Sequence, residues 1–275
     1  MRFDINQLKA MKLRGEKIVM LTAYDYTTAK IVDRCGVPLI LVGDSLGMVM
    51  LGYETTIPVT MEDILHHTKA VTRGAENAFI IADMPFMTYH LSIEQALSNA
   101  ARLVQEGGAQ GVKLEGGVNV ADKVRAITLA GIPVMGHIGF TPQYIYEFGG
   151  FKAQGKTRER AKMLLEDARA LEEAGAFAVV LELVPSPLAN LITQKLSIPT
   201  IGIGAGADCD GQIQVISDIL GLDPDFIPRH AKRYAHIVDI MSTAVTLYCQ
   251  EVKEGTFPTE KESIGVDPRE IEGLE

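Results

Sequence analysis

Eight short apolar runs, spaced over residues 18–221, constrain the fold of this chain more than any other feature. Each run is rich in Val, Ile and Leu, and all but one end at Gly, Asp or Pro. Near-continuous apolar runs of this length indicate strands buried on both faces, which is typical of a parallel sheet. The runs are residues 18–25, 38–45, 78–85, 111–117, 132–139, 176–185, 198–206 and 212–221.

The segments between most of these runs carry helical patterns. Their apolar residues recur at the spacing of amphipathic helices. Thr60 and Thr157 stand where N-caps belong, and Thr60 with Asp63 has the spacing of a capping box. The expected helices are residues 27–36, 60–75, 92–109, 119–131 and 157–176.

This alternation predicts an α/β fold, the (β/α)8 or TIM barrel, with a short N-terminal helix before the first strand. An open doubly wound sheet is the alternative. The barrel is favoured because eight units fill about 200 residues and no G-x-G-x-x-G run follows the first strand. Only about six residues separate the last two runs, so we expect a vestigial seventh helix. A final helix is expected over residues 229–252.

Composition is that of an ordinary globular protein, since 47% of the 275 residues are apolar and 22% are charged. The net charge of −9 is unevenly spread, because residues 251–275 hold eight acids and three bases and so carry −5. We therefore expect a single catalytic domain over residues 1–252 and an acidic, flexible tail over residues 253–275. The acid excess disfavours nucleic-acid binding, which needs clustered Lys and Arg.

Other features of the sequence predict a cytoplasmic protein. The three cysteines are far apart and form no C-x-x-C pair, which suits a reducing compartment. The first 17 residues carry charges throughout and lack the apolar segment of a signal peptide. No apolar run approaches the roughly 18 residues that a membrane span needs.

In a barrel of this type, functional residues lie at the C-terminal ends of the strands. Three consecutive strands each deliver a carboxylate there, from Asp44, Asp83 and Glu115, and neighbouring strands lie about 4.8 Å apart. Clustered carboxylates repel one another unless a cation lies among them, and oxygen ligands alone favour Mg²⁺ or Mn²⁺ over Zn²⁺. The alternative is that each acid caps a turn or helix, the role we expect for Asp25 and Asp218.

Three further residues at the strand ends carry candidate chemistry. Lys113 shares a face with Glu115, so it could neutralise that acid or hold a substrate carboxylate or enolate. Glu182 follows an apolar run and could be a general base or a salt-bridged core residue. His137 could contact a ligand or act as a structural hydrogen-bond donor.

These groups together suit one reaction type. A 2-oxo acid could chelate the metal through its carboxylate and keto oxygens, and the metal would acidify the neighbouring C–H. Glu182 would remove that proton, while the metal and Lys113 would stabilise the enolate. The enolate would then attack an electrophile, or the reverse reaction would cleave a C–C bond. The residues alone identify neither the substrate nor the electrophile.

The segment over residues 137–157 is a long loop with several glycines, and its aromatic residues include Tyr144, Tyr146, Phe148 and Phe151. It could serve as a lid or an assembly surface, or its aromatic residues could simply pack against the barrel.

Several motifs resemble one family over about residues 3–250, the ketopantoate (3-methyl-2-oxobutanoate) hydroxymethyltransferases. The runs VGDSLG and KLEGG together are highly specific for it. The matching stretches are residues 20–33, 41–74, 82–89, 111–117, 133–143, 149–155, 180–185 and 200–215.

The resemblance implies a Mg²⁺-dependent barrel that transfers a hydroxymethyl group from 5,10-methylenetetrahydrofolate to 3-methyl-2-oxobutanoate. The product would be 2-dehydropantoate, on the route to pantothenate and coenzyme A. The resemblance also implies a large homo-oligomer, often a homodecamer. The implied site residues are Asp44, Asp83 and Glu115 for the metal, Asp44, Ser45, Asp83, Lys113 and His137 for the 2-oxo acid, and Glu182 as the proton acceptor.

There are two alternatives, one from the same superfamily of barrels and one from a different class of protein. The first is a C–C lyase or mutase of the phosphoenolpyruvate/isocitrate lyase superfamily, whose lyases resemble one another in a KCGH loop with a catalytic Cys. Here the one Cys followed by Gly is Cys35, at a predicted helix end and without the Lys or His. The second is a non-catalytic binding barrel, which would not need three acids, a Lys and a buried Glu at one mouth.

Overall fold

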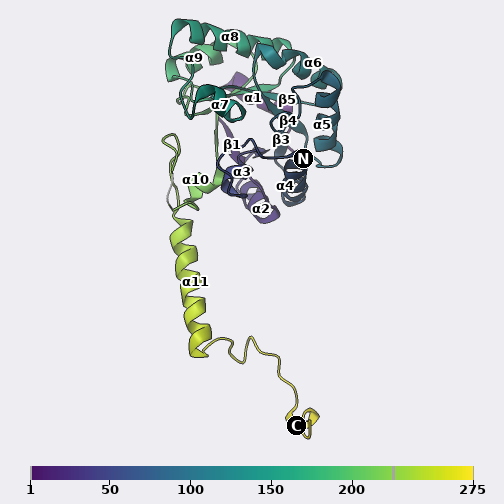
Figure 1. Ribbon diagram of the computed structural model, residues 1–275, viewed down its shortest axis with the longest axis vertical. Helices are drawn as coiled ribbons and strands as arrows, with labels where there is room; N and C mark the ends of the chain where they lie inside the picture. The colour runs from purple at the N-terminus through teal and green to yellow at the C-terminus, as the bar shows by residue number, and fades with distance from the viewer. Residues whose placement is uncertain (1, 225–226, 275) are drawn as a thin grey trace. The chain divides into compact units, whose positions relative to one another are not determined.

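A computed structural model describes residues 2–224 and 227–274 and contains a closed barrel of eight strands (Figure 1). Each strand pairs in parallel with the next, and β8 pairs with β1 to close the barrel. This confirms the predicted TIM barrel. The strands are β1 Ile18–Thr22, β2 Leu39–Val42, β3 Phe79–Asp83, β4 Gly111–Glu115, β5 Val134–Gly139, β6 Ala178–Glu182, β7 Thr200–Ile203 and β8 Gly211–Gln214.

Helices follow most of the strands, and all five helices expected between strands are present. We expected a vestigial seventh helix, and residues 204–210, between β7 and β8, contain no helix at all. The helices of this part of the chain are α1 Ile5–Arg14, α2 Tyr26–Arg34, α3 Leu46–Val49, α4 Met61–Gly74, α5 Ile93–Gln105, α6 Ala121–Leu129, α7 Ile145–Phe148, α8 Arg158–Glu173 and α9 Ser186–Lys195.

Side-chain caps fix where several helices begin. Asp25 accepts the backbone N–H of Thr28 at the start of α2, which is the structural role expected for it. Thr60 and Asp63 form the predicted capping box at α4, where Asp63 accepts the Thr60 N–H at 2.9 Å. Thr157 caps α8 without a capping box, as its hydroxyl accepts the backbone N–H of Arg160 at 3.3 Å. Such caps satisfy backbone donors that the helix itself leaves unpaired.

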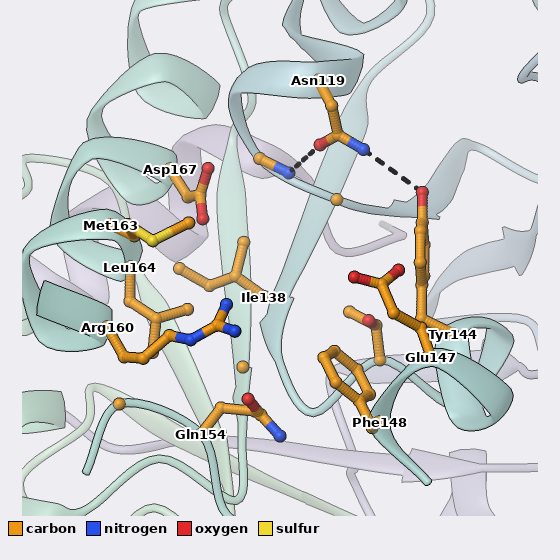
Figure 2. Close-up of a pocket in the computed structure, with 15 residues that line it drawn as sticks. Asn119, Ile138, Tyr144, Glu147, Phe148, Gln154, Arg160, Met163, Leu164 and Asp167 are labelled. Atoms are coloured by element: carbon orange, nitrogen blue, oxygen red, sulfur yellow. Dashed lines mark hydrogen bonds between the residues drawn. The ribbon is translucent and has the colours of Figure 1, made fainter. Parts of the chain in front are cut away.

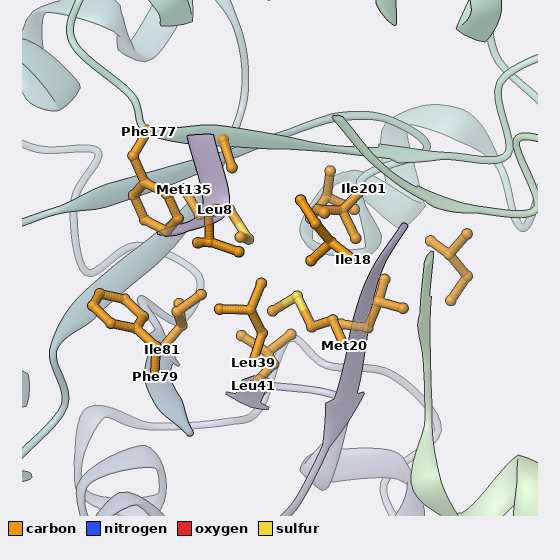
Figure 3. Close-up of a cluster of buried hydrophobic side chains, with 14 residues drawn as sticks. Leu8, Ile18, Met20, Leu39, Leu41, Phe79, Ile81, Met135, Phe177 and Ile201 are labelled. Atoms are coloured by element: carbon orange, nitrogen blue, oxygen red, sulfur yellow. The ribbon is translucent and has the colours of Figure 1, made fainter. Parts of the chain in front are cut away.

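The N-terminal helix α1 packs onto the N-terminal side of the barrel core (Figure 3). Its Leu8 is buried in one cluster with Ile18, Leu39, Phe79 and Phe177, which stand at or next to the first residues of their strands. The rings of Phe79 and Phe177 pack edge to face with centroids 5.8 Å apart. Because apolar side chains fill this end of the barrel, polar chemistry is confined to the opposite, C-terminal end.

Two predicted elements differ from the structure. The run over residues 212–221 is a strand only up to Gln214, and α10 Ile216–Leu220 follows it, so Asp218 lies in a helix and not at a strand end. The final helix begins at Ile237, not at residue 229. An apolar run of this length does not distinguish a buried strand from a helix, and no side-chain cap marks the start of the final helix.

The chain divides into two compact units. One comprises residues 2–216 and 228–231 and holds the barrel; the other comprises residues 217–224, 227 and 232–274. The second unit holds α11 Ile237–Glu254, in which no residue is buried, and the short helix η3 Pro268–Glu270. The predicted domain boundary after residue 252 and the flexibility of the tail stay predictions. Over the described ranges, no helix is both long and apolar enough to cross a membrane.

Candidate active site

Six of the predicted site residues meet at the C-terminal ends of strands β2 to β6. Five of them are buried, and the side chain of Glu182 is 14% exposed. All six are connected, either by direct contacts or through the bridging side chain of Gln143. They are Asp44 after β2, Asp83 on β3, Lys113 and Glu115 on β4, His137 on β5 and Glu182 on β6.

Asp83 lies between Asp44 and Lys113. Its Oδ2 accepts the backbone N–H of Asp44 at 2.9 Å, and its Oδ1 lies 2.7 Å from Lys113 Nζ. The glycine before Asp44 packs closely against its neighbours, since a Cβ on Gly43 would lie 2.9 Å from Ser45 Oγ and 3.4 Å from Asp83 Oδ2.

Lys113 is a buried cation among carboxylates. Burial opposes its charge, but Asp83, Glu115 and Asp44 outweigh that effect and raise the pKa of Lys113 above its ordinary value. Burial likewise raises the pKa of Asp83, and Lys113 opposes that rise. Lys113 therefore stays charged and compensates part of the negative charge of the cluster.

Gln143, which the sequence did not single out, bridges two of the acids. Its Nε2 donates to Asp44 Oδ2 at 2.9 Å and to the Met84 carbonyl at 3.0 Å. Its backbone N–H donates to Glu115 Oε2 at 3.0 Å. The Tyr89 hydroxyl lies 2.7 Å from Gln143 Oε1 and so fixes which way the amide points.

Gln143 lies in the short helix η2 Pro142–Tyr144, within the aromatic segment predicted as a lid or an assembly surface. This part of the segment is buried against the acid cluster, so it belongs to the site. No local signal in the sequence marks Gln143 or Tyr89, because both act through contacts that form only when the barrel closes.

His137 lies between two carboxylates. Its Nε2 is 3.2 Å from Glu182 Oε2, and its Nδ1 is 3.4 Å from Glu115 Oε1 and 3.3 Å from Lys113 Nζ. Burial and Lys113 act to lower the pKa of His137, but the close contacts with Glu115 and Glu182 outweigh them and raise it to about 9. A protonated ring cannot accept a bond from Lys113, so its two N–H groups face the two carboxylates.

Asp44 shows that the cluster has an excess of negative charge. Burial raises the pKa of Asp44 well above its ordinary value, and the charges of Asp83 and Glu115 raise it further. Glu115 Oε1 is also buried without a hydrogen bond. A divalent cation would relieve both conditions, and carboxylate oxygens are the ligands that Mg²⁺ prefers.

Lys113 and Gln143 contact carboxylate oxygens that a metal ion would share. Within residues 2–224 and 227–274, no group of three or more His, Cys, Asp or Glu side chains is arranged to hold a metal ion. The cluster fits Mg²⁺ in donor chemistry and in charge, and binding would replace one or more of these contacts.

Ser45 and Asp218 lie apart from the contacts just described. Ser45 begins α3, and its Oγ lies 2.9 Å from the Tyr24 hydroxyl. Asp218 stands in the first turn of α10, where burial raises its pKa to about 6. Ser45 neighbours the acid cluster through Gly43, whereas Asp218 belongs to the second unit of the chain.

A cavity of about 230 Å³ lies beside the ends of β4 and β5 (Figure 2). Gly116 and Gly117, which follow Glu115, line it from one strand. Ile138 and Gly139, which follow His137, line it from the next. The cavity thus adjoins the two strands that carry the centre of the acid cluster.

Solved structures with the same fold define the class of protein. The chain superposes on a phosphonopyruvate hydrolase solved with oxalate and Mg²⁺, with a TM-score of 0.59 and 13% identity, over 98% of this chain and 94% of that one. It superposes equally on 2,3-dimethylmalate lyase, described as a member of the PEP mutase/isocitrate lyase superfamily, with a TM-score of 0.59 and 15% identity, over 100% and 96%. The protein thus belongs to the class of (β/α)8 barrels and shares that fold with these two enzymes.

Sequence comparison identifies the family within that class. Residues 2–260 match the ketopantoate hydroxymethyltransferase family. A protein of Dehalococcoides mccartyi is 64% identical over 274 residues, covering 100% of this chain and 98% of its own, and one of Enterococcus faecalis is 58% identical, covering 97% of each. Both are named 3-methyl-2-oxobutanoate hydroxymethyltransferase. The chain belongs to the ketopantoate hydroxymethyltransferase family of enzymes, which confirms the resemblance found in its motifs.

Proposed function

We propose that this enzyme transfers the one-carbon unit of 5,10-methylenetetrahydrofolate to C3 of 3-methyl-2-oxobutanoate and forms 2-dehydropantoate for pantothenate biosynthesis. The observation that carries the proposal is the arrangement of the barrel mouth. Three buried acids and Lys113 lie on one side of His137, and Glu182 lies on the other, 3.2 Å from its Nε2. Family membership supports the same reaction.

The acids of the mouth would hold the metal and the 2-oxo acid. Asp44, Asp83 and Glu115 would ligate Mg²⁺, which when bound supplies Lewis-acid polarisation of the substrate's oxygens. Lys113, with Ser45, would bind the 2-oxo acid beside them. The charge of Lys113 would stabilise the negative charge that develops on the keto oxygen when C3 loses its proton.

Glu182 would accept that proton. Its Oε2 faces the His137 Nε2 at 3.2 Å, and this contact would hold the carboxylate in one orientation. C3 would then form a bond to the methylene carbon, and the bonds from that carbon to folate nitrogen would break. Water supplies the hydroxyl oxygen, so the products are 2-dehydropantoate and tetrahydrofolate.

Deuterium exchange at C3 of 3-methyl-2-oxobutanoate, measured without folate, tests the proton-transfer half of this proposal. We expect the unsubstituted enzyme to exchange C3 in the presence of Mg²⁺, and we expect excess chelator or Glu182→Gln to abolish exchange. Glu166→Gln, on the exposed face of α8, is the control and should exchange normally. Exchange that persists in Glu182→Gln, or that is absent from the unsubstituted enzyme with Mg²⁺, would contradict the assignment.

The metal assignment has its own test. Asp83→Ala should weaken Mg²⁺ binding, measured by calorimetry, and abolish formation of 2-dehydropantoate while the far-ultraviolet circular dichroism stays unchanged. Unchanged turnover in a folded Asp83→Ala enzyme would reject Asp83 as a ligand. The lyase and mutase alternative is not favoured, because its members share only the fold, at 13–15% identity in the two structures compared.

The proposal includes a cytoplasmic homo-oligomer, expected to be a homodecamer. The expectation of a homodecamer comes from the family resemblance and not from a contact seen in the structure. Light scattering coupled to size exclusion tests the subunit number directly, and a monomer at micromolar concentration would reject it.

A further inference from the structure

The cavity beside β4 and β5 has no role in the proton transfer described above. One of its walls comes from α7 and the segment before it, with Tyr144 and Phe148 (Figure 2). The facing wall comes from α8, with Met163 and Leu164, and Ile138 lies between the two walls. An aromatic wall opposite an aliphatic one is suited to a flat ring system.

Polar groups stand at separate places around this cavity. Asp167 and Arg160 both line it from α8. They are seven residues apart, so they share a helix face at a separation of roughly 10 Å along the axis. Asn119 lines the cavity as well, and its amide is fixed by bonds to the Gly117 N–H at 2.9 Å and the Tyr144 hydroxyl at 3.2 Å.

Asp167 is built into the cavity wall by its close approach to Gly117, the second residue after Glu115. Its Oδ1 accepts the Val118 N–H at 2.9 Å. A Cβ on Gly117 would lie 2.1 Å from the Asp167 carboxyl, so only glycine permits this approach. Burial raises the pKa of Asp167 above its ordinary value. Within the described ranges no Lys, Arg or His forms an ion pair with Asp167, which leaves this half-buried carboxylate able to accept N–H groups from a ligand.

We infer that this cavity binds the bicyclic pterin-type ring of the one-carbon donor, with the Asp167 carboxylate accepting the N–H and amino groups of the pyrimidine edge. This inference rests on the proposed function. The volume is below the roughly 300–1,000 Å³ of sites that enclose a whole drug-sized ligand, so the ring enters and the remainder of the donor stays outside. Arg160, which is exposed, provides a cation for the donor's carboxylate end.

The position of the cavity explains how donor and acceptor meet. It is lined by the residues directly after Glu115 and His137, and those two side chains belong to the acid cluster where the 2-oxo acid would be bound. A donor held there lies next to the substrate without displacing any member of the cluster. The same arrangement predicts that changes at Asp167 act on the donor and not on the 2-oxo acid.

Asp167→Asn tests this subsite in the full-length enzyme. The amide keeps the shape but loses the acceptor charge, so we expect the KM for 5,10-methylenetetrahydrofolate to rise about tenfold or more. The KM for 3-methyl-2-oxobutanoate should change less than about twofold. The affinity for tetrahydrofolate, measured by calorimetry, should fall by the same factor as the KM for the donor rises. Glu166→Gln, the adjacent exposed acid of α8, is the matched control and should behave as the unsubstituted enzyme.

Arg160→Gln provides a second variant at an exposed position, where folding is not at risk. We expect a severalfold rise in the same KM, and this variant decides the matter if Asp167→Asn does not fold. The subsite is overturned if folded Asp167→Asn binds tetrahydrofolate as tightly as the unsubstituted enzyme, or if both KM values rise together. Failure of the proposed function is a separate result, because it would appear as a lack of C3 exchange in the unsubstituted enzyme without any folate present.

Discussion

Lys113→Met removes the one buried lysine that stands among the acids of the barrel mouth. Methionine is similar in length and apolar, so packing of the side-chain stem is largely kept. Lys113 Nζ lies 2.7 Å from Asp83 Oδ1, and the two side chains are 4% and 2% exposed, so water cannot replace the lost charge. Removing one partner of a buried ion pair lowers the free energy of unfolding by about 3–5 kcal/mol.

Protonation of an acid limits this loss and makes it depend on pH. Burial already raises the pKa of Asp83, and without Lys113 the rise is larger. A carboxyl whose pKa is higher in the folded state than in the unfolded state lowers the free energy of unfolding as pH rises above the unfolded value. The loss is about 1.4 kcal/mol per pH unit. From the ordinary value of 3.8, a carboxyl that keeps its proton lowers stability by at most about 1.6 kcal/mol at pH 5 and about 4 kcal/mol at pH 7.

Urea denaturation with chelator present, at pH 5 and pH 7, measures the effect. We expect Lys113→Met to be less stable than the unsubstituted enzyme by about 1–2 kcal/mol at pH 5 and about 3–4 kcal/mol at pH 7. The control is Lys162→Met, whose lysine is 79% exposed and 3.7 Å from Glu166; it should change stability by about 0–1 kcal/mol at both values. A loss in Lys113→Met that is equal at the two pH values would arise from packing rather than charge and would refute the reasoning.

Three further predictions follow from the contacts of the site and from the tail. His137→Gln should lower the free energy of unfolding by on the order of 3 kcal/mol at pH 6. This loss should shrink as pH rises from 6.5 to about 9, because the raised pKa stabilises the fold only while the ring is protonated. Denaturation at pH 6, 7.5 and 9 measures the loss, and a loss that is constant over these values contradicts a protonated ring. Gln143→Leu should reduce kcat or Mg²⁺ affinity by about tenfold or more, because Asp44 loses the donor that orients it; rates over a Mg²⁺ series test this, and a parental profile rejects it. Deleting residues 256–275 should leave turnover intact, and a large loss would mean that the tail covers a site or an interface.

The barrel and its acidic mouth could be predicted because both depend on local pattern. A strand buried on both faces has an apolar run as its signature, and the residue that ends the run stands at the mouth. Asp83, Glu115 and Glu182 are the last residues of their strands, and Asp44 is the second residue after its strand. Spacing along the chain was therefore enough to bring them to one end of the barrel.

Gln143 and Tyr89 could not be predicted, because their roles depend on closure of the barrel. Gln143 contacts Asp44, 99 residues away in the sequence, and the Tyr89 hydroxyl contacts Gln143 from 54 residues away. Tyr89 stands in an irregular segment after β3, and Gln143 in the three-residue helix η2 after β5. Neither segment is long enough for a periodicity that indicates which way a side chain points. A glutamine or tyrosine in such a segment is ordinarily a surface residue, and only the observed burial separates these two from that expectation.

The KLEGG run contains more than the two ionisable residues that the proposed acceptor site needs, and its other residues have structural reasons of their own. Lys113 and Glu115 alternate with Leu114 along β4, so the two ionisable side chains reach the mouth while the leucine is buried in the opposite direction. The metal and the 2-oxo acid would require only these two ionisable residues, yet the glycines are equally part of the run. Gly117 is required by the carboxyl of Asp167, which approaches its backbone too closely for any side chain. Four of the five residues of this run would thus contribute to two adjoining sites, and substitutions at Glu115 and at Gly117 should separate the chemistry of the acceptor from the binding of the donor.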